Sequence, residues 1–190
     1  MDAAHELAVF GKMAQELPDY LLSDVLFWQL QAGSDFPKLS LGRLLLARAR
    51  LRALEPRLSP AQQAAWREAE QQTHNALSQW QVAGERHASQ ELRARANLWQ
   101  RFWEDCADSP CADNYAHEVG QRTMAELLLR EFARVGDTPE ARVLKALDTT
   151  VKARLRANGF VWDEALRPVF PEKDFWFLYG RPYGQALARR

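Results

Sequence analysis

Long apolar runs and a net charge of either sign are missing from this chain of 190 residues. Its longest apolar runs, such as residues 44–47, are far shorter than the ~20 residues that a transmembrane helix needs. The first residues lack the basic start and apolar stretch of a signal peptide, which predicts a cytoplasmic protein with no membrane partner. Apolar residues make up 47% and charged residues 26%, which argues against disorder and indicates a soluble domain with its own core.

Cysteine is scarce, since Cys106 and Cys111 are the only two. With Pro110 between them they could meet across a turn, but reduced thiols are expected in the cytoplasm. Together with His117 they would offer three zinc ligands, yet the paired Cys-x-x-Cys of structural zinc sites is missing. We therefore predict neither a disulfide nor a metal here.

Catalytic motifs are missing from the sequence as well. There is no Glu-x-x-His pair for a di-iron bundle, no His-Glu-x-x-His, no Gly-x-Ser-x-Gly elbow and no P-loop. The pairs Glu70 with His74 and His87 with Glu91 share a helix face, and we interpret them as surface or interhelix pairs. The sequence thus predicts no cofactor and no metal, and it does not favour an enzyme.

Two-residue alternation is absent, so we predict no sheet, while helix boundary signals are clear. Apolar residues recur at helical spacing from Pro18 to Gly33, and residues 39–54 have two apolar faces with arginines between them, typical of a sandwiched helix. Ser59-Pro60 and Thr138-Pro139 each combine an N-cap with a first-turn proline. Gly136 and Asn158-Gly159 are predicted to end the helices before and after the second of these starts.

Residues 60–106 contain no proline after Pro60 and one glycine, Gly84, which would make one helix about 70 Å long. We expect two consecutive helices or one kinked near Gly84, because the apolar stripe changes register there. The first stripe keeps a heptad spacing, so a homodimer along it is the alternative to packing within the chain. Its members are Trp66, Ala69, Thr73, Ala76, Trp80, Ala83 and His87, and the second stripe contains Leu92, Trp99, Phe102, Trp103 and Cys106.

Charge is unevenly distributed although the net charge is zero. Residues 1–37 carry six acids and one base, whereas residues 38–58 carry six bases and one acid. The simpler interpretation is that these segments pack together as a helix pair. The alternative is that Arg43, Arg50 and Arg57, spaced seven residues apart, track the phosphates of a nucleic acid, which the near-neutral isoelectric point disfavours.

The C-terminal segment is dense in aromatic residues and interrupted by prolines. Eight of the chain's twenty aromatic residues fall within residues 160–183, with Pro168, Pro171 and Pro182 among them. One interpretation is a strap that buries its rings across the helices. The other is an exposed binding patch formed by Trp176, Tyr179, Arg181 and Tyr183.

We therefore predict one all-α domain over residues 1–190, an irregular bundle of about six helices with a long central helix and an extended aromatic tail over residues 159–190. The favoured function is a non-enzymatic protein-interaction or scaffold domain that uses the tail. A small-molecule-binding or enzymatic bundle is the alternative, with a cavity lined by Trp66, Trp80, Trp99 and Trp103 and containing a buried His87 or Glu91.

Overall fold

The computed structural model describes residues 2–33, 36–106 and 111–183, and within these ranges the chain is all-α with one very small sheet. The α-helices are α1 (Ala3–Leu22), α2 (Leu41–Leu54), α3 (Pro60–Gln79), α4 (Gln81–Asp105), α5 (Tyr115–Glu131) and α6 (Pro139–Arg154). Short 3-10 helices are η1 (Glu55–Arg57), η2 (Ala133–Asp137), η3 (Glu164–Val169) and η4 (Trp176–Tyr179). The predicted all-α fold of about six helices is confirmed.

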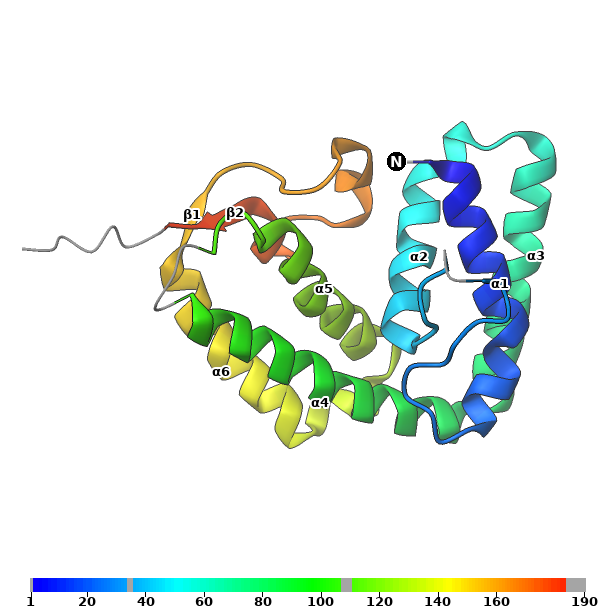
Figure 1. The fold of residues 1–190 in the computed structure, drawn as a ribbon, viewed down its shortest axis with the longest axis horizontal. Helices are drawn as coiled ribbons and strands as arrows, with labels where there is room; N and C mark the ends of the chain where they lie inside the picture. The colour runs from blue at the N-terminus through cyan, green and yellow to red at the C-terminus, as the bar shows by residue number, and fades with distance from the viewer. Residues whose placement is uncertain (1, 34–35, 107–110, 184–190) are drawn as a thin grey trace, which may run out of the picture.

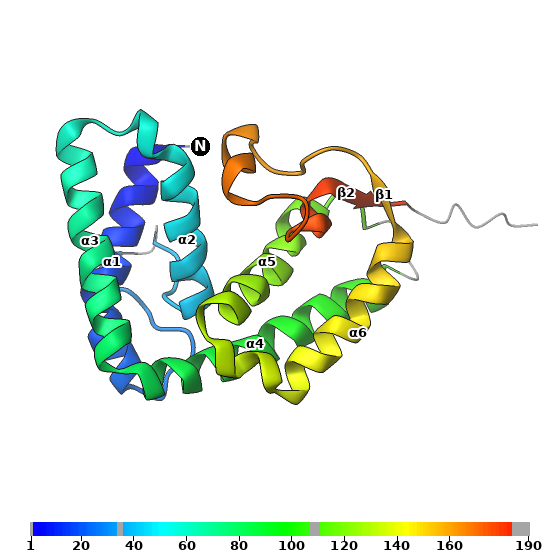
Figure 2. The same cartoon turned by 180° about the vertical axis from the view of Figure 1, so that it is seen from behind.

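The helices form two groups at opposite ends of the molecule (Figures 1 and 2). At one end α1, α2 and α3 run side by side, and at the other lie α5, α6 and the C-terminal tail. The longest helix, α4, runs from the first group along the second. Between the groups, α2 contacts α1, α4, α5 and η3, so it is the sandwiched helix that its two apolar faces predicted.

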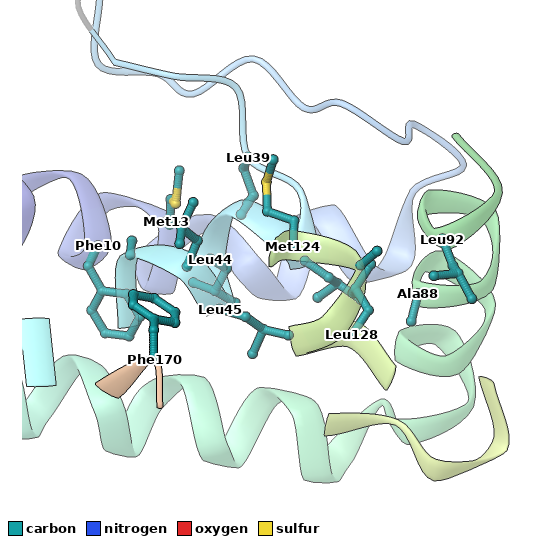
Figure 3. Packing of buried hydrophobic residues seen from close by; sticks show 14 of the residues in the cluster. Phe10, Met13, Leu39, Leu44, Leu45, Ala88, Leu92, Met124, Leu128 and Phe170 are labelled. Carbon is teal, nitrogen blue, oxygen red and sulfur yellow. The ribbon is translucent and has the colours of Figure 1, made fainter. Parts of the chain in front are cut away.

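One continuous core joins both groups through α2. Figure 3 shows Leu44 and Leu45 of α2 among apolar side chains from other elements. These neighbours include Phe10 and Met13 of α1, Ala88 and Leu92 of α4, Met124 and Leu128 of α5, and Phe170 of the tail. No helix in the described part of the chain combines the length and hydropathy that crossing a bilayer requires.

The prediction of a helix from Pro18 to Gly33 was wrong. Pro18 lies inside α1, which begins after the N-cap Asp2, and the chain then returns without a helix over residues 23–33 and 36–40. The carboxylate of Glu16 anchors this return, because it accepts hydrogen bonds from the indole of Trp28 (2.8 Å) and the backbone N–H of Gln31 (2.9 Å). These tertiary hydrogen bonds outweigh the helical spacing of the apolar residues.

The long segment over residues 60–106, for which the sequence left two helices and one kinked helix open, is two consecutive helices. Helix α3 begins with a complete capping box between Ser59 and Gln62. The break falls at Trp80, whose backbone leaves the helical region (φ −114°, ψ 42°), four residues before Gly84. Helix α4 starts directly afterwards at an angle to α3 (Figure 1). As a result α3 packs in the first helix group, while α4 extends along the second.

The heptad stripe packs within the chain, so the alternative of a dimer along it was wrong. Trp66, Thr73 and His87 are all buried, and the ring of Trp66 lies 4.9 Å from that of Phe10 on α1. The second stripe is also internal, since the buried rings of Trp99 and Trp103 pack at an angle against the ring of Tyr115 of α5.

The aromatic tail is a strap that packs against α2 through η3 and against α5 through η4. Phe170, Phe175 and Phe177 are buried, and the hydroxyl of Tyr115 donates to the backbone oxygen of Phe177 over 2.7 Å. Beneath the strap, the buried Arg122 binds Asp148 with two hydrogen bonds of 2.9 and 2.7 Å.

Contrary to our prediction of no sheet, the chain forms a two-stranded antiparallel ribbon of β1 (Leu155–Ala157) and β2 (Gly180–Pro182). This ribbon ends α6 at Arg154, before the Asn158-Gly159 stop that the sequence suggested. Likewise α5 ends at Glu131, and Gly136 lies within η2 instead of closing that helix.

The two cysteines form a disulfide, so the expectation of reduced thiols was wrong. Cys106 and Cys111 are five residues apart, and the bond joins the end of α4 to the segment before α5. Neither sulfur is then available as a zinc ligand, which rules out a zinc site formed by the two cysteines and His117.

Candidate functional site

A cleft of about 360 Å³ lies between α1 and α2 on one side and α5 and Trp162 on the other. Its apolar lining consists of Val9, Met13, Pro37, Leu46, Ala47 and Met124. Its polar side chains come from His5, Glu6, Arg43, Arg50, His117 and Gln121. The cleft therefore offers an apolar surface together with several cationic or hydrogen-bonding groups.

Arg43 lines this cleft and makes no ion pair within the described residues, although the carboxylate of Glu91 is near enough to favour its charge. It is half-buried in the first turn of α2, and its guanidinium donates to the backbone oxygen of Lys38 (3.3 Å). Burial, and then the nearby charge of Arg95, lower the pKa of Arg43 below the ordinary arginine value. Within the described residues no carboxylate lies at ion-pairing distance from Arg43.

Arg50 lies two helical turns further along α2 and is partly neutralised. Its Nη1 is 3.3 Å from a carboxylate oxygen of Glu6, and its guanidinium lies 5.6 Å from the ring centroid of Trp162. The Nε of Arg50 is buried and has no acceptor among the described residues. Trp162 is fixed as a wall, because its indole donates to the backbone oxygen of Ala116 over 2.8 Å.

Small residues on α5 keep the cleft open. Ala116 and Gly120 are one helical turn apart, and both line it. A Cβ built on Gly120 would meet no heavy atom within 4 Å, so the space beside this residue is empty of protein.

A buried ionic network supports the cleft from behind. Glu91 is completely buried, and its carboxylate accepts from the hydroxyl of Ser40 (2.7 Å) and the N–H of Gly42 (2.9 Å). Arg95 donates to the same carboxylate through Nε (3.0 Å) and Nη2 (2.8 Å). Its Nη1 donates to the side chain of Gln121 (2.6 Å), which also lines the cleft. The network therefore links the N-terminus of α2 to α4 and α5 and fixes the position of Arg43.

Gly42 is required for this arrangement. A Cβ at this position would lie 2.6 Å from Oε1 of Glu91 and 3.0 Å from the Cβ of Met124. The close approach explains why a glycine stands in the first turn of a buried helix.

His87 and Glu91 are both buried, but neither lines one of the described pockets. The Nε2 of His87 is 3.0 Å from the backbone oxygen of Ser23, and its ring lies 4.5 Å from that of Tyr20. Burial lowers the pKa of His87, and its Nδ1 has no partner among the described residues. His87 thus holds the corner after α1 in place.

The tryptophans of the predicted cavity line at most one of the three pockets described for this part of the chain. Trp66, Trp99 and Trp103 are buried in the core, and they line none of the described pockets. Trp80 does line a pocket, an open groove of about 610 Å³ at the corner between α3 and α4.

The predicted arginine row is divided by the fold. Arg43 and Arg50 face the cleft and are half-buried, whereas Arg57 is exposed in η1 and does not line it. Arg50 pairs with Glu6 of α1, so one member of the row is partly neutralised within the chain.

The predicted tail patch is also divided. Tyr179 is only 8% exposed and donates its hydroxyl to the backbone oxygen of Phe170, so it belongs to the strap. Trp176 is half-buried beneath Lys152, while Arg181 and Tyr183 are exposed on the ribbon. Three of the four predicted residues therefore remain at or near the surface.

Sequence reasoning missed the cleft because its walls come from segments far apart in the chain. In the sequence, His117 was considered only together with the two cysteines, and Trp162 only as part of the aromatic C-terminal segment. No spacing rule links them to Arg43. The seven-residue spacing of the arginines did identify Arg43 and Arg50, but as contacts for the phosphates of a nucleic acid.

Among the described residues, no cluster of three or more His, Cys, Asp or Glu side chains is arranged to hold a metal ion. In comparisons with known proteins, no protein-family model, no curated protein and no solved structure matches this chain.

Proposed function

We propose that this protein binds a small organic anion with an apolar body, such as a carboxylate, in the cleft between α1, α2 and α5. Arg43 carries the proposal. It is a half-buried cation that lines the cleft, and the described residues place no carboxylate within ion-pairing distance of it. An anionic ligand group would supply an ion-pair partner and accept its hydrogen bonds.

The surroundings of Arg43 support this choice of ligand. Neighbouring arginines on the same helix are already neutralised, since Arg48 pairs with Glu131 and Arg52 pairs with Glu70. The cleft volume of about 360 Å³ lies within the usual range for small-molecule sites. Its apolar floor, with Val9, Met13 and Leu46, would cover the body of the ligand.

Binding fits this lining better than covalent catalysis does. Among the described residues the lining contains no serine, threonine, cysteine or lysine that could act as a nucleophile. The enzymatic version of this hypothesis is therefore not part of the proposal.

The test is thermal unfolding of the protein with pairs of carboxylates and their uncharged amides, for example phenylacetate and phenylacetamide. A ligand present at 100 times its Kd stabilises the folded state by about 2.7 kcal/mol. We expect carboxylates to raise the melting temperature and the matched amides to leave it unchanged.

The variant Arg43→Met should lose this response while keeping the fold. Arg67→Met is the matched control, because Arg67 is exposed on α3 and does not line the cleft. Equal responses to acids and amides, or a full response in Arg43→Met, would refute the proposal.

Two earlier expectations remain predictions. The protein-interaction function now depends on Trp176, Arg181 and Tyr183 alone. A cytoplasmic location is opposed by the Cys106–Cys111 bond, because disulfides persist mainly in oxidising compartments. Alkylation and mass spectrometry of the protein from its native cells would measure whether the two thiols are free.

A further inference from the structure

The ribbon of β1 and β2 places two arginines directly opposite each other. Arg156 and Arg181 are register partners in the antiparallel pair, so their side chains leave the same face of the ribbon. Both are exposed, and no described carboxylate lies within ion-pairing distance of either. Like charges on facing positions destabilise a pair of strands, which makes this an unusual place for two arginines unless an anion binds there.

Further basic side chains stand on the exposed side of α6, whose last residue, Arg154, directly precedes β1. Arg142, Lys145 and Lys152 recur at helical spacing on its outer side, and all three are exposed. The acidic residues of α6 do not neutralise them, because Glu140 binds Arg93 and Asp148 binds the buried Arg122. We refer to Arg142, Lys145, Lys152, Arg156 and Arg181 as the basic face; α6 and the ribbon that carry it lie at the end of the molecule away from α1 and α3 (Figure 1).

Aromatic rings lie within the basic face. The guanidinium of Arg156 lies 4.4 Å from the ring centroid of Tyr183, and Tyr183 is 39% exposed. The hydroxyl of Tyr183 donates to the backbone oxygen of Ala153 (2.8 Å), which holds the ring in place. The ammonium of Lys152 lies 4.8 Å from the half-buried ring of Trp176. The face therefore combines cations that can contact phosphates with planar groups on which bases can stack.

We propose that the basic face binds single-stranded nucleic acid, with Arg156 and Arg181 contacting adjacent phosphates and Tyr183 with Arg156 forming a stacking platform. A lipid surface fits less well, because Val143 is the only large aliphatic side chain on α6 and the ribbon that is strongly exposed among the described residues. The proposal is independent of the cleft, since none of its residues lines that cleft.

The experiment measures fluorescence anisotropy of a labelled oligothymidylate titrated with the full chain, at several salt concentrations. The test variant is Arg156→Ser/Arg181→Ser. The control is Arg57→Ser/Arg67→Ser, which removes the same charge from exposed positions in the α1–α3 group. Circular dichroism of each variant verifies that it is folded.

We expect the ribbon variant to bind about tenfold more weakly and the control to bind as the unmodified protein does. The slope of log K against log salt should become shallower by about 1.4, because each phosphate contact on a single strand contributes about 0.7. Tyr183→Leu should weaken binding without changing the salt slope, since it removes stacking and no charge.

Three results would overturn the proposal: no binding by the unmodified protein, equal losses in the ribbon variant and the control, or an unchanged affinity in the ribbon variant. Vesicles of phosphatidylserine and phosphatidylcholine form a parallel arm. Binding to these vesicles without binding to the oligonucleotide would assign the basic face to anionic lipid and would also overturn it.

Discussion

Replacing Gly42 by alanine should destabilise this protein, although the same change stabilises most helices. Alanine is favoured over glycine by up to about 1 kcal/mol within a helix. At Gly42, however, the new methyl group would lie 2.6 Å from Oε1 of Glu91 and 3.0 Å from the Cβ of Met124. Glu91 cannot easily move away, because Ser40, Arg95 and the N–H of Gly42 itself hold its carboxylate.

The magnitude follows from two costs that oppose the gain in helix propensity. Overpacking a tight core site costs about 1–3 kcal/mol. Displacing the carboxylate weakens the bond from the N–H of Gly42, and hydrogen bonds to charged groups contribute about 1.5–3 kcal/mol. We expect a net loss of about 2 kcal/mol in the free energy of unfolding.

Gly120→Ala is the matched control, because Gly120 is also helical and a Cβ there meets no heavy atom within 4 Å. The Gly120→Ala change should raise the free energy of unfolding by about 0.5–1 kcal/mol. Both variants are compared by urea unfolding, followed by tryptophan fluorescence, with the midpoint read at constant m value. In a Glu91→Ala background the Gly42→Ala change should cost less, since the contacted oxygen is gone.

The reasoning fails if Gly42→Ala is as stable as the unmodified protein or more stable. It also fails if the cost of Gly42→Ala is the same with and without Glu91, because the contact with that carboxylate would then be irrelevant.

Three further predictions concern the strap, the disulfide and acid stability. Phe170→Ala should cost about 3–5 kcal/mol in urea unfolding, because this ring is completely buried between the tail and the core; a cost below 1 kcal/mol would contradict the strap. Cys106→Ser/Cys111→Ser should cost about 2 kcal/mol by the loop-entropy relation, and reductant should then lower the stability of the unmodified protein alone. Because burial lowers the pKa of His87, the folded state binds its proton less readily than the unfolded chain, so stability should fall as the pH drops below about 6.5. His87→Gln, which keeps a donor for Ser23, should reduce that pH dependence, and an unchanged dependence would assign it to other groups.

Local signals in the sequence determined much of the fold. Two helix starts were predicted at the correct residue, from Ser59 with Pro60 and from Thr138 with Pro139. Capping is a local signal, because a cap satisfies backbone groups only a few positions away. The change of stripe near Gly84 predicted a break or kink in the long segment, and the chain breaks at Trp80. The two apolar faces of residues 39–54 predicted a helix in contact on several sides. Such features depend on neighbours in sequence.

Only the tertiary structure decided where the chain departs from those signals. Apolar residues in 23–33 have helical spacing, but this segment is not helical and is held by the hydrogen bonds to Glu16. The pairing of β1 with β2, which sets Arg156 opposite Arg181, ends α6 early. The cleft likewise depends on the meeting of α1, α2, α5 and Trp162. Local preferences of about 1 kcal/mol per residue set the helices, whereas hydrogen bonds and aromatic packing between distant segments together are large enough to override them. No local pattern in the sequence records these contacts.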